Sequence, residues 1–236
     1  MTEVSIFLQA RMSSSRLPGK VLMPLAGAPA LARQIERVQR SEIRQLVLLT
    51  SDEASDDPLE SLADQLGVAC YRGSLPDVLG RYAGALERYP CTHIVRLTGD
   101  CPLTDWSVID SVVAHHLDGD YDYSTNTLVR RDPQGLDVEV VRAQCLRAAA
   151  EQSHDPYERE HVMPYFYRQP ERFRLGSVES VRDLSSLRWT LDYPQDYQFI
   201  AAVYERLYAA NPAFSADDIL ALLQAEPALA EINAGL

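Results

Sequence analysis

Short apolar runs alternate, in the first half of the chain, with segments whose apolar side chains recur at helical spacing. The runs typical of buried strands are VSIFLQA, QLVLLTS, VACYRG and THIVRLTGD, at residues 4–10, 45–51, 68–73 and 92–100. The helical patterns between them lie at residues 29–40, 58–67 and 77–89. Because strands that alternate with helices need crossover connections, the pattern predicts an α/β fold with a mainly parallel sheet and helices on both faces.

The second half of the chain continues with both kinds of element. Further helices are predicted at residues 106–117, 142–152, 161–169 and 194–210. Extended segments are predicted at residues 121–127, 135–141, 173–178 and 186–192. No repeat, low-complexity tract or obvious linker interrupts the sequence. We therefore expect one domain over residues 1–236, with a hairpin-like insertion at about residues 121–141.

Charge and composition narrow the class of protein. The 236 residues carry a net charge of −12, which argues against general affinity for nucleic acids or anionic membranes, because both partners favour basic surfaces. The first residues lack the basic and apolar regions of a signal peptide, and no apolar stretch approaches about 18 residues, so we expect a cytoplasmic protein. The four cysteines form no C-x-x-C pair, which favours reduced thiols over disulfides or a zinc site.

The loop QARMSSSRLPGK, Gln9–Lys20, gathers cations directly after the first predicted strand. It lies at the C-terminal edge of the predicted sheet, where open α/β sheets bind ligands. The groups suited to wrap phosphate oxygens are Arg11, Ser13, Ser14, Ser15, Arg16, Gly19 and Lys20. The loop is not a Walker P-loop, since Val21 stands where that motif has Ser or Thr. It predicts a local anion site, with a solvated polar loop as the alternative.

Two aspartates stand where predicted strands meet turns. Asp100 ends RLTGD, and Asp192 ends RWTLD. If these strands are neighbours, the two carboxylates can hold one Mg²⁺, which accepts one or two carboxylates and takes its other oxygens from water and phosphates. The alternative is that each aspartate caps the helix that follows it. Asp196, in the first turn of the last long predicted helix, suits the helix dipole.

Five motifs together resemble a known family. QARMSSSRLPGKVL, RGSLPDVLGRY, RLTGDCPL, YEREHVMPYFY and LRWTLDYPQDY, in this order, are similar to the cytidylyltransferases that include the CMP-sugar synthetases for 3-deoxy-manno-octulosonate, sialic acid and pseudaminic acid. The resemblance is closest to the branch of spore coat polysaccharide biosynthesis cytidylyltransferases, and it covers nearly the whole chain. It implies a single Rossmann-like nucleotidyltransferase domain that forms a homodimer through a projecting hairpin. The segment at residues 121–141 is compatible with such an arm.

The resemblance also assigns individual residues. Those assigned to the triphosphate of CTP are Arg11, Ser15, Arg16 and Lys20. Those assigned to Mg²⁺, the expected cofactor, are Asp100 and Asp192. Those assigned to the base and ribose are Arg72, Gly73, Ser74 and Arg81. The 3-deoxy-manno-octulosonate enzymes have QGDEP where this chain has Leu97–Pro102, so their sugar is not carried over, and cytosine is implied by the resemblance alone.

The implied reaction is attack by an oxygen of an acidic sugar, or of a sugar-like acceptor, on the α-phosphorus of CTP, for surface polysaccharide or glycoconjugate biosynthesis. Pyrophosphate leaves, and catalysis consists mostly of positioning and charge neutralisation, for which we single out Arg16, Lys20 and Asp100. The candidate acceptor residues are Glu139, Arg159 and His161. The alternatives are a solvent-facing strand residue at Glu139 and, in YEREHV, a charged helical turn with internal ion pairs.

Two other functions are compatible with parts of the sequence. An A-type glycosyltransferase holds its metal with a D-x-D motif, which Asp120 and Asp122 match, but this motif opens a predicted strand instead of ending one. Such an enzyme also has no need of a loop that holds a full triphosphate. A nucleotide-binding regulator without turnover is the third possibility, and the presence of Lys20 and both strand-end aspartates argues against it.

Overall fold

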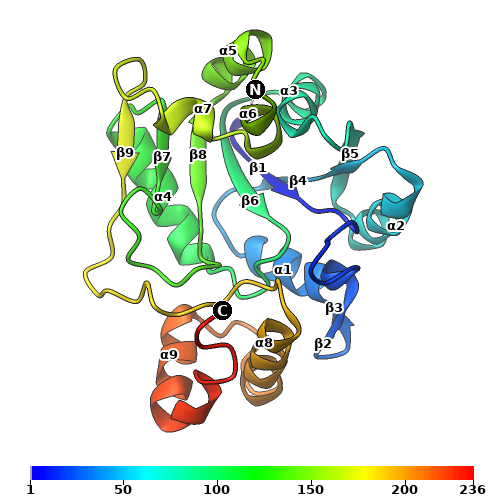
Figure 1. Cartoon of the computed structure of the whole chain (residues 1–236), viewed down its shortest axis with the longest axis vertical. Coiled ribbons are helices and arrows are strands. Elements are labelled where there is room, and N and C mark those ends of the chain that lie inside the picture. The colour runs from blue at the N-terminus through cyan, green and yellow to red at the C-terminus, as the bar shows by residue number, and fades with distance from the viewer. Residues whose placement is uncertain (1) are drawn as a thin grey trace.

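A seven-stranded sheet forms the centre of the computed structural model, which describes residues 2–236 (Figure 1). Its strands, in spatial order, are β5 (Ala69–Gly73), β4 (Gln45–Ser51), β1 (Thr2–Gln9), β6 (Cys91–Thr98), β8 (Glu139–Arg142), β7 (Tyr123–Thr125) and β9 (Leu175–Ser177). The pairs β5–β4, β4–β1 and β1–β6 are parallel, as is β7–β9, whereas β8 is antiparallel to both of its neighbours. The predicted α/β class with a mainly parallel sheet is confirmed.

Helices cover both faces of this sheet. Those on one face are α1 (Ala30–Val38), α2 (Asp57–Leu66) and α4 (Trp106–Asp118). Those on the other face are α3 (Val78–Arg88), α5 (Ala143–Gln152), α6 (Pro156–His161) and α7 (Pro164–Tyr167). Within β1, Ile6 and Leu8 are buried in the first apolar cluster and Phe7 in the second. Burial of alternate side chains on opposite faces explains why this strand has a continuous apolar sequence.

A third apolar cluster lies at the lower end of the molecule in Figure 1. It is built from α8 (Pro194–Leu207) and α9 (Ala216–Ala225), and the short ribbon β2 (Pro24–Leu25) and β3 (Ala28–Pro29) contributes Leu25. Three single turns, η1 (Lys20–Leu22), η2 (Ala54–Asp56) and η3 (Pro227–Leu229), complete the elements of residues 2–236. Across these residues, every helix falls short of the length or the apolar character that a bilayer-spanning helix needs.

Two predicted elements differ from the structure. The helix predicted at residues 161–169 is divided, because Val162 has a φ of 68° and Pro164 starts a new helix, α7. The strand predicted at residues 186–192 joins no sheet and forms only an isolated bridge between Arg188 and Gln134. Its apolar alternation instead buries Trp189 and Leu191 in the third cluster, and their amides donate to the carbonyls of neighbouring loops.

The segment at residues 121–141 contains two antiparallel strands joined by a long loop, and both strands belong to the main sheet instead of to a projecting arm. β7 and β8 pair antiparallel, with Tyr123 opposite Val141. The long loop between them is closed by buried Asn126, whose amide nitrogen donates to Asp132 at 2.8 Å and whose oxygen accepts from the amide of Val138 at 2.9 Å. The side chain of Asn126 therefore organises this loop.

Two histidines connect β6 to α4, away from the loop after β1. His116 of α4 is fully buried, with one ring nitrogen 3.0 Å from His93 Nδ1 and the other 2.9 Å from the hydroxyl of Ser124. Burial lowers the pKa of His116 to about 3, and it lowers the pKa of His93 as well. Both side chains are therefore neutral in the folded protein near neutral pH.

This burial predicts acid sensitivity. In the unfolded chain His116 takes up a proton near its ordinary pKa of 6.5, whereas the folded state resists protonation down to about 3. The unfolded state thus binds more protons between these values, so the free energy of unfolding falls as the pH decreases through this window. Urea unfolding at several pH values checks this, and His116→Gln is expected to have a flatter dependence than the wild type. An equally steep dependence in the variant contradicts it.

Candidate active site

The loop after β1 folds back on itself and carries Lys20 inward. The amide of Met12 donates to the buried carboxylate of Asp56 at 2.8 Å, which anchors the start of the loop. Gly19 has a φ of 71°, a left-handed conformation that glycine adopts without steric cost, and its amide donates to the carbonyl of Met12 at 3.1 Å. The loop closes there and η1 begins, so that the residue at position 20 is only 8% exposed.

Lys20 lies between the two aspartates that the sequence singled out. Its Nζ donates to Asp100 Oδ2 at 2.9 Å and to Asp192 Oδ1 at 2.7 Å. Arg16 also contacts Asp192 Oδ1, at 2.8 Å, and Arg188 donates to the other oxygen of Asp192 at 3.2 Å. Residues distant in the sequence therefore form one ion cluster beyond the C-terminal end of β6, and Lys20 is the only lysine in the chain.

The charges of this cluster support one another. Burial by itself raises the pKa of Asp192, but hydrogen bonds from Lys20 and Arg16 outweigh burial and lower the pKa to about 2. Burial likewise lowers the pKa of Lys20, and the two aspartates more than offset it, so the pKa is raised. Lys20 and Asp192 are therefore both ionised near neutral pH.

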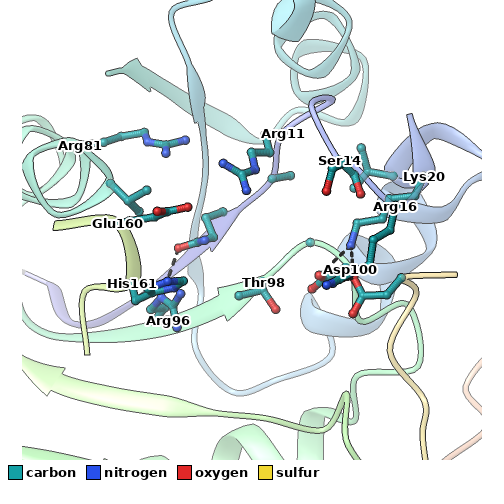
Figure 2. Close-up of a pocket in the computed structure, with 17 residues that line it drawn as sticks. Arg11, Ser14, Arg16, Lys20, Arg81, Arg96, Thr98, Asp100, Glu160 and His161 are labelled. Atoms are coloured by element: carbon teal, nitrogen blue, oxygen red, sulfur yellow. Dashed lines mark hydrogen bonds and ion pairs between the residues drawn. The ribbon is translucent and has the colours of Figure 1, made fainter. Parts of the chain in front are cut away.

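The ion cluster forms one end of a pocket of about 250 Å³. The pocket is lined by Gln9, Ala10, Arg11, Ser14, Ser15, Arg16, Lys20, Val21, Val78, Arg81, Arg96, Thr98, Gly99, Asp100, Glu160, His161 and Asp192. Figure 2 shows Lys20, Arg16 and Asp100 at one end, Arg81, Glu160, His161 and Arg96 at the other, and Arg11 and Thr98 between them. We call these the lysine end and the histidine end.

The lining is locally basic in a chain of net charge −12. Five Lys or Arg side chains line the pocket against three Asp or Glu side chains. Arg81 is 4% exposed, and its Nε has no hydrogen-bond partner among residues 2–236. Burial lowers the pKa of Arg81, and the charge of Arg11 acts in the same direction. A buried guanidinium nitrogen without a partner is costly, which indicates a ligand that supplies hydrogen-bond acceptors.

The floor at the histidine end is a network on four neighbouring strands. Arg96 of β6 donates from Nε to Gln9 Oε1 at 3.2 Å and from Nη1 to the carboxylate of Glu139. The other oxygen of Glu139 accepts from the hydroxyl of Tyr123 at 2.8 Å. Burial lowers the pKa of Arg96, and the charge of Glu139 more than compensates, so the pKa is raised.

A strained turn places His161 in the pocket. Val162, directly after α6, has φ 68° and ψ −65°, and the amide of Met163 donates back to the carbonyl of His161 at 2.8 Å. This is a γ-turn with positive φ, a rare conformation that is unfavourable for a β-branched residue. The Val162 side chain is fully buried in the second apolar cluster, which holds the turn in place. Glu160 and His161 therefore face the pocket.

Comparison with known proteins shows the family and the fold of this chain. The family described as Cytidylyltransferase matches residues 5–211, which include the loop after β1, both aspartates and His161. The chain belongs to the cytidylyltransferase family. This cytidylyltransferase is 34% identical over 236 residues to the spore coat polysaccharide biosynthesis protein SpsF of Bacillus subtilis, covering 96% of each chain.

Two further relatives extend the comparison. A solved cytidylyltransferase from Leptospira borgpetersenii superimposes with a TM-score of 0.94 at 33% identity, covering 100% of this chain and 99% of that one. A 3-deoxy-manno-octulosonate cytidylyltransferase from Chromohalobacter salexigens is 34% identical over 142 residues, which are 60% of this chain and 54% of that protein. The predicted family is confirmed.

Most of the residues predicted for nucleotide and metal lie in the pocket. Those that line it are Arg11, Ser15, Arg16, Lys20, Arg81, Asp100 and Asp192. Arg72, Gly73 and Ser74 do not line it. The Arg72 guanidinium pairs with Asp57 at 2.7 Å and Glu60 at 2.8 Å, both on α2. Gly73 instead lies against the stem of Arg81, where an added Cβ would be 3.2 Å from Cγ, so it contributes to the pocket indirectly.

Of the three predicted acceptor residues, only His161 lines the pocket. Arg159 donates to Asp77 at 2.6 Å and to the carbonyls of Ala150 and Ser153 at 3.1 and 2.9 Å. This guanidinium ties α6 to the start of α3 and to the end of α5, which explains why it does not face the pocket. Glu139 accepts from Arg96 and is not among the residues that line the pocket.

Several lining residues were absent from the sequence prediction. They are Gln9, Val78, Arg96, Thr98 and Gly99. Arg96 and Thr98 had a signal, because polar residues on one face of an apolar strand, two and four positions before Asp100, indicate a strand face that lines a site.

The D-x-D motif lies elsewhere. Asp120 pairs with Arg142, and Asp122 accepts from the amide of Arg174 at 2.9 Å, at the start of β7. Neither side chain lines the pocket, so the motif is not combined with the cationic loop.

Asp100 and Asp192 are suited to a hard cation. Oxygens of both carboxylates lie within 2.9 Å of the same Lys20 nitrogen, so they converge on one point. Among residues 2–236, no cluster of three or more His, Cys, Asp or Glu side chains is arranged to hold a metal. A pair of carboxylates without further protein ligands fits Mg²⁺, which keeps water or phosphate oxygens in its remaining positions.

Proposed function

We propose that this cytidylyltransferase transfers CMP from CTP to an acidic sugar or sugar-like acceptor and releases pyrophosphate. The observation that carries the proposal is Lys20, held between Asp100 and Asp192 beside Arg16 at the sheet edge where α/β proteins bind ligands. The similar proteins named for spore coat polysaccharide biosynthesis and for 3-deoxy-manno-octulosonate support an acidic sugar as the acceptor class.

The lysine end suits the triphosphate. Arg16 and Lys20 provide charge, and the hydroxyls of Ser14 and Ser15 provide hydrogen bonds in the same lining. When phosphate oxygens are present, Lys20 and Arg16 can donate to them, which leaves Asp100 and Asp192 available to hold Mg²⁺. Bound Mg²⁺ would neutralise charge on the phosphates during transfer. Lys20 and Arg16 then stabilise the negative charge that develops on the transferring and departing phosphates.

The base is expected between the loop after β1 and α3. Val78 and Ala10 offer apolar contact there, and the unpaired Arg81 offers donors. We expect Arg81→Gln to weaken CTP binding at least about tenfold, because hydrogen bonds to a charged donor are lost. Arg72→Gln serves as the matched control, and we expect less than about threefold change because its partners are on α2. Isothermal titration calorimetry with CTP measures both, and equal losses contradict this placement.

Pyrophosphate release tests the proposal as a whole. The purified protein is incubated with Mg²⁺, CTP and each of 3-deoxy-manno-octulosonate and N-acetylneuraminate, and mass spectrometry identifies the CMP adduct. We expect acceptor-dependent pyrophosphate release with CTP. Sugar transfer from a nucleotide sugar without pyrophosphate release supports the glycosyltransferase alternative instead, and CTP binding without any turnover supports the regulator.

A further inference from the structure

The histidine end contains a cation that neither the sequence motifs nor the comparisons assign. Arg96 lies on the central strand β6, on the same face as Thr98, and both side chains line the pocket. Figure 2 shows it at the histidine end, away from Lys20 and Arg16. Its position separates it from the cations expected to bind the triphosphate.

The hydrogen bonds of Arg96 leave part of its guanidinium free. A guanidinium has five N–H donors. Gln9 and Glu139 accept one each, from Nε and Nη1. Among residues 2–236, Nη2 of Arg96 has no hydrogen-bond partner and is not one of the buried atoms that lack one, so its two N–H donors are accessible. Because Arg96 lines the pocket, those donors are available to a ligand there.

Glu139 fixes the orientation of this guanidinium. It holds Nη1 with one oxygen and is itself fixed by Tyr123 at 2.8 Å through the other. Both members of the pair are largely buried, with side-chain exposures of 13% for Arg96 and 14% for Glu139, yet only Arg96 reaches the pocket. A buried ion pair contributes little stability compared with apolar side chains of the same volume, so stability alone is a weak reason for its presence.

Resting on the proposed function, we propose that Arg96 binds the carboxylate of the acceptor and that Glu139 is its positioning residue. A guanidinium fork matches a carboxylate in a way that an ammonium group does not. Arg159 cannot take this role while its nitrogens donate to Asp77, Ala150 and Ser153. Glu139, expected from the sequence to contact the acceptor, acts through Arg96 instead.

The test uses two variants that preserve the buried network as far as possible. Arg96→Lys keeps the charge and loses the fork. Arg96→Met combined with Glu139→Gln removes both charges together, which avoids an unpaired buried carboxylate. The glutamine oxygen can still accept from the Tyr123 hydroxyl. Arg130→Lys is the matched control, since Arg130 forms an ion pair with Asp137 at 2.7 Å outside the pocket lining. Thermal unfolding and CTP calorimetry establish that each variant is folded.

The measurement compares the KM for each substrate with CTP and the sugar acids 3-deoxy-manno-octulosonate and N-acetylneuraminate. We expect both Arg96 variants to raise the acceptor KM at least about tenfold and to leave the CTP KM within about threefold. The wild type should also be inhibited more strongly by a sugar acid than by its neutral C1 alcohol, and the double variant should lose this preference. Arg130→Lys should resemble the wild type in each respect.

An unchanged acceptor KM in the folded variants overturns the inference, as does an equal rise in the KM for CTP, which would place Arg96 against the nucleotide. In either case wild-type turnover with CTP still supports the proposed function. If the wild type turns over neither sugar acid, the acceptor class of the proposed function fails, and the inference fails with it.

Discussion

Replacing Lys20 with alanine is expected to lower the turnover of CTP by at least about a hundredfold at saturating substrate. Lys20 is the single lysine of the chain, and its nitrogen lies between two carboxylates beside the expected triphosphate. The substitution removes a charge aimed at the phosphates, and it also leaves Asp100 and Asp192 facing each other with one cation fewer. Initial rates of pyrophosphate release measure the effect.

The control for this prediction is Arg206→Ala. It removes an α8 cation whose partner, at 2.7 Å, is Glu226 directly after α9, and we expect wild-type turnover from it. Thermal unfolding of both variants shows whether a loss of turnover comes from the site alone or from loss of the folded structure. Wild-type rates in folded Lys20→Ala would remove Lys20 from the catalytic machinery.

The second large effect is expected from Asp192→Asn, in the response of stability to Mg²⁺. A ligand that binds only the folded state adds about 2.7 kcal/mol when present at a hundred times its Kd, so CTP with Mg²⁺ should raise the melting temperature. Asn keeps an oxygen that can accept from Lys20 and Arg16, but it loses the charge that a divalent cation requires. We therefore expect the variant to lose most of the increase that depends on Mg²⁺ while keeping the part that CTP produces alone.

Asp183→Asn is the matched control, because Asp183 is an exposed carboxylate that, within residues 2–236, accepts only from Ser185 in its own turn. Differential scanning fluorimetry with CTP, with Mg²⁺ and with both gives the comparison for each protein. A full Mg²⁺ response in Asp192→Asn would show that this carboxylate serves only as the ion-pair partner of Lys20 and Arg16.

The strands and the loop of the site could be predicted because their signals are local. β1, β4 and β6 are largely buried, which gives runs rich in apolar residues, and the cations of the loop follow the first of these runs directly. Asp100 likewise comes directly after the run that predicts β6. In these strands, burial of the side chains determines both the apolar sequence pattern and the place of the strand in the sheet.

Asp192 lies beside Asp100 at the Lys20 nitrogen, although the segment inferred to carry it as a strand is not a strand. Trp189 and Leu191 alternate as in a strand because they are buried, but their amides donate to loop carbonyls at Gln134 and Asp100 instead of to a sheet. Apolar periodicity reports which side chains are buried and does not report where the backbone finds its hydrogen bonds.

The choice between arginines could not be made from the sequence. Arg159 and Arg96 both belong to motifs that suggest a binding site, YEREHV and RLTGD. Only the fold brings Asp77 to Arg159 and Glu139 to Arg96. The γ-turn at Val162 left no signal either, since valine is unfavourable at positive φ and is held there by tertiary packing. Ion pairing and strain of this kind depend on contacts between distant segments.

The most direct measurement is the response of the Lys20 side chain itself to CTP. Because the sequence has one lysine, protein labelled with ¹³C-lysine has one lysine Cε resonance, and this resonance reports on the group between Asp100 and Asp192. We expect it to shift saturably on titration with CTP and Mg²⁺, as the ammonium exchanges carboxylate partners for phosphates, and to stay in place on titration with cytidine. A resonance that does not move while calorimetry shows CTP bound, or an absence of CTP binding, would contradict a triphosphate site at Lys20.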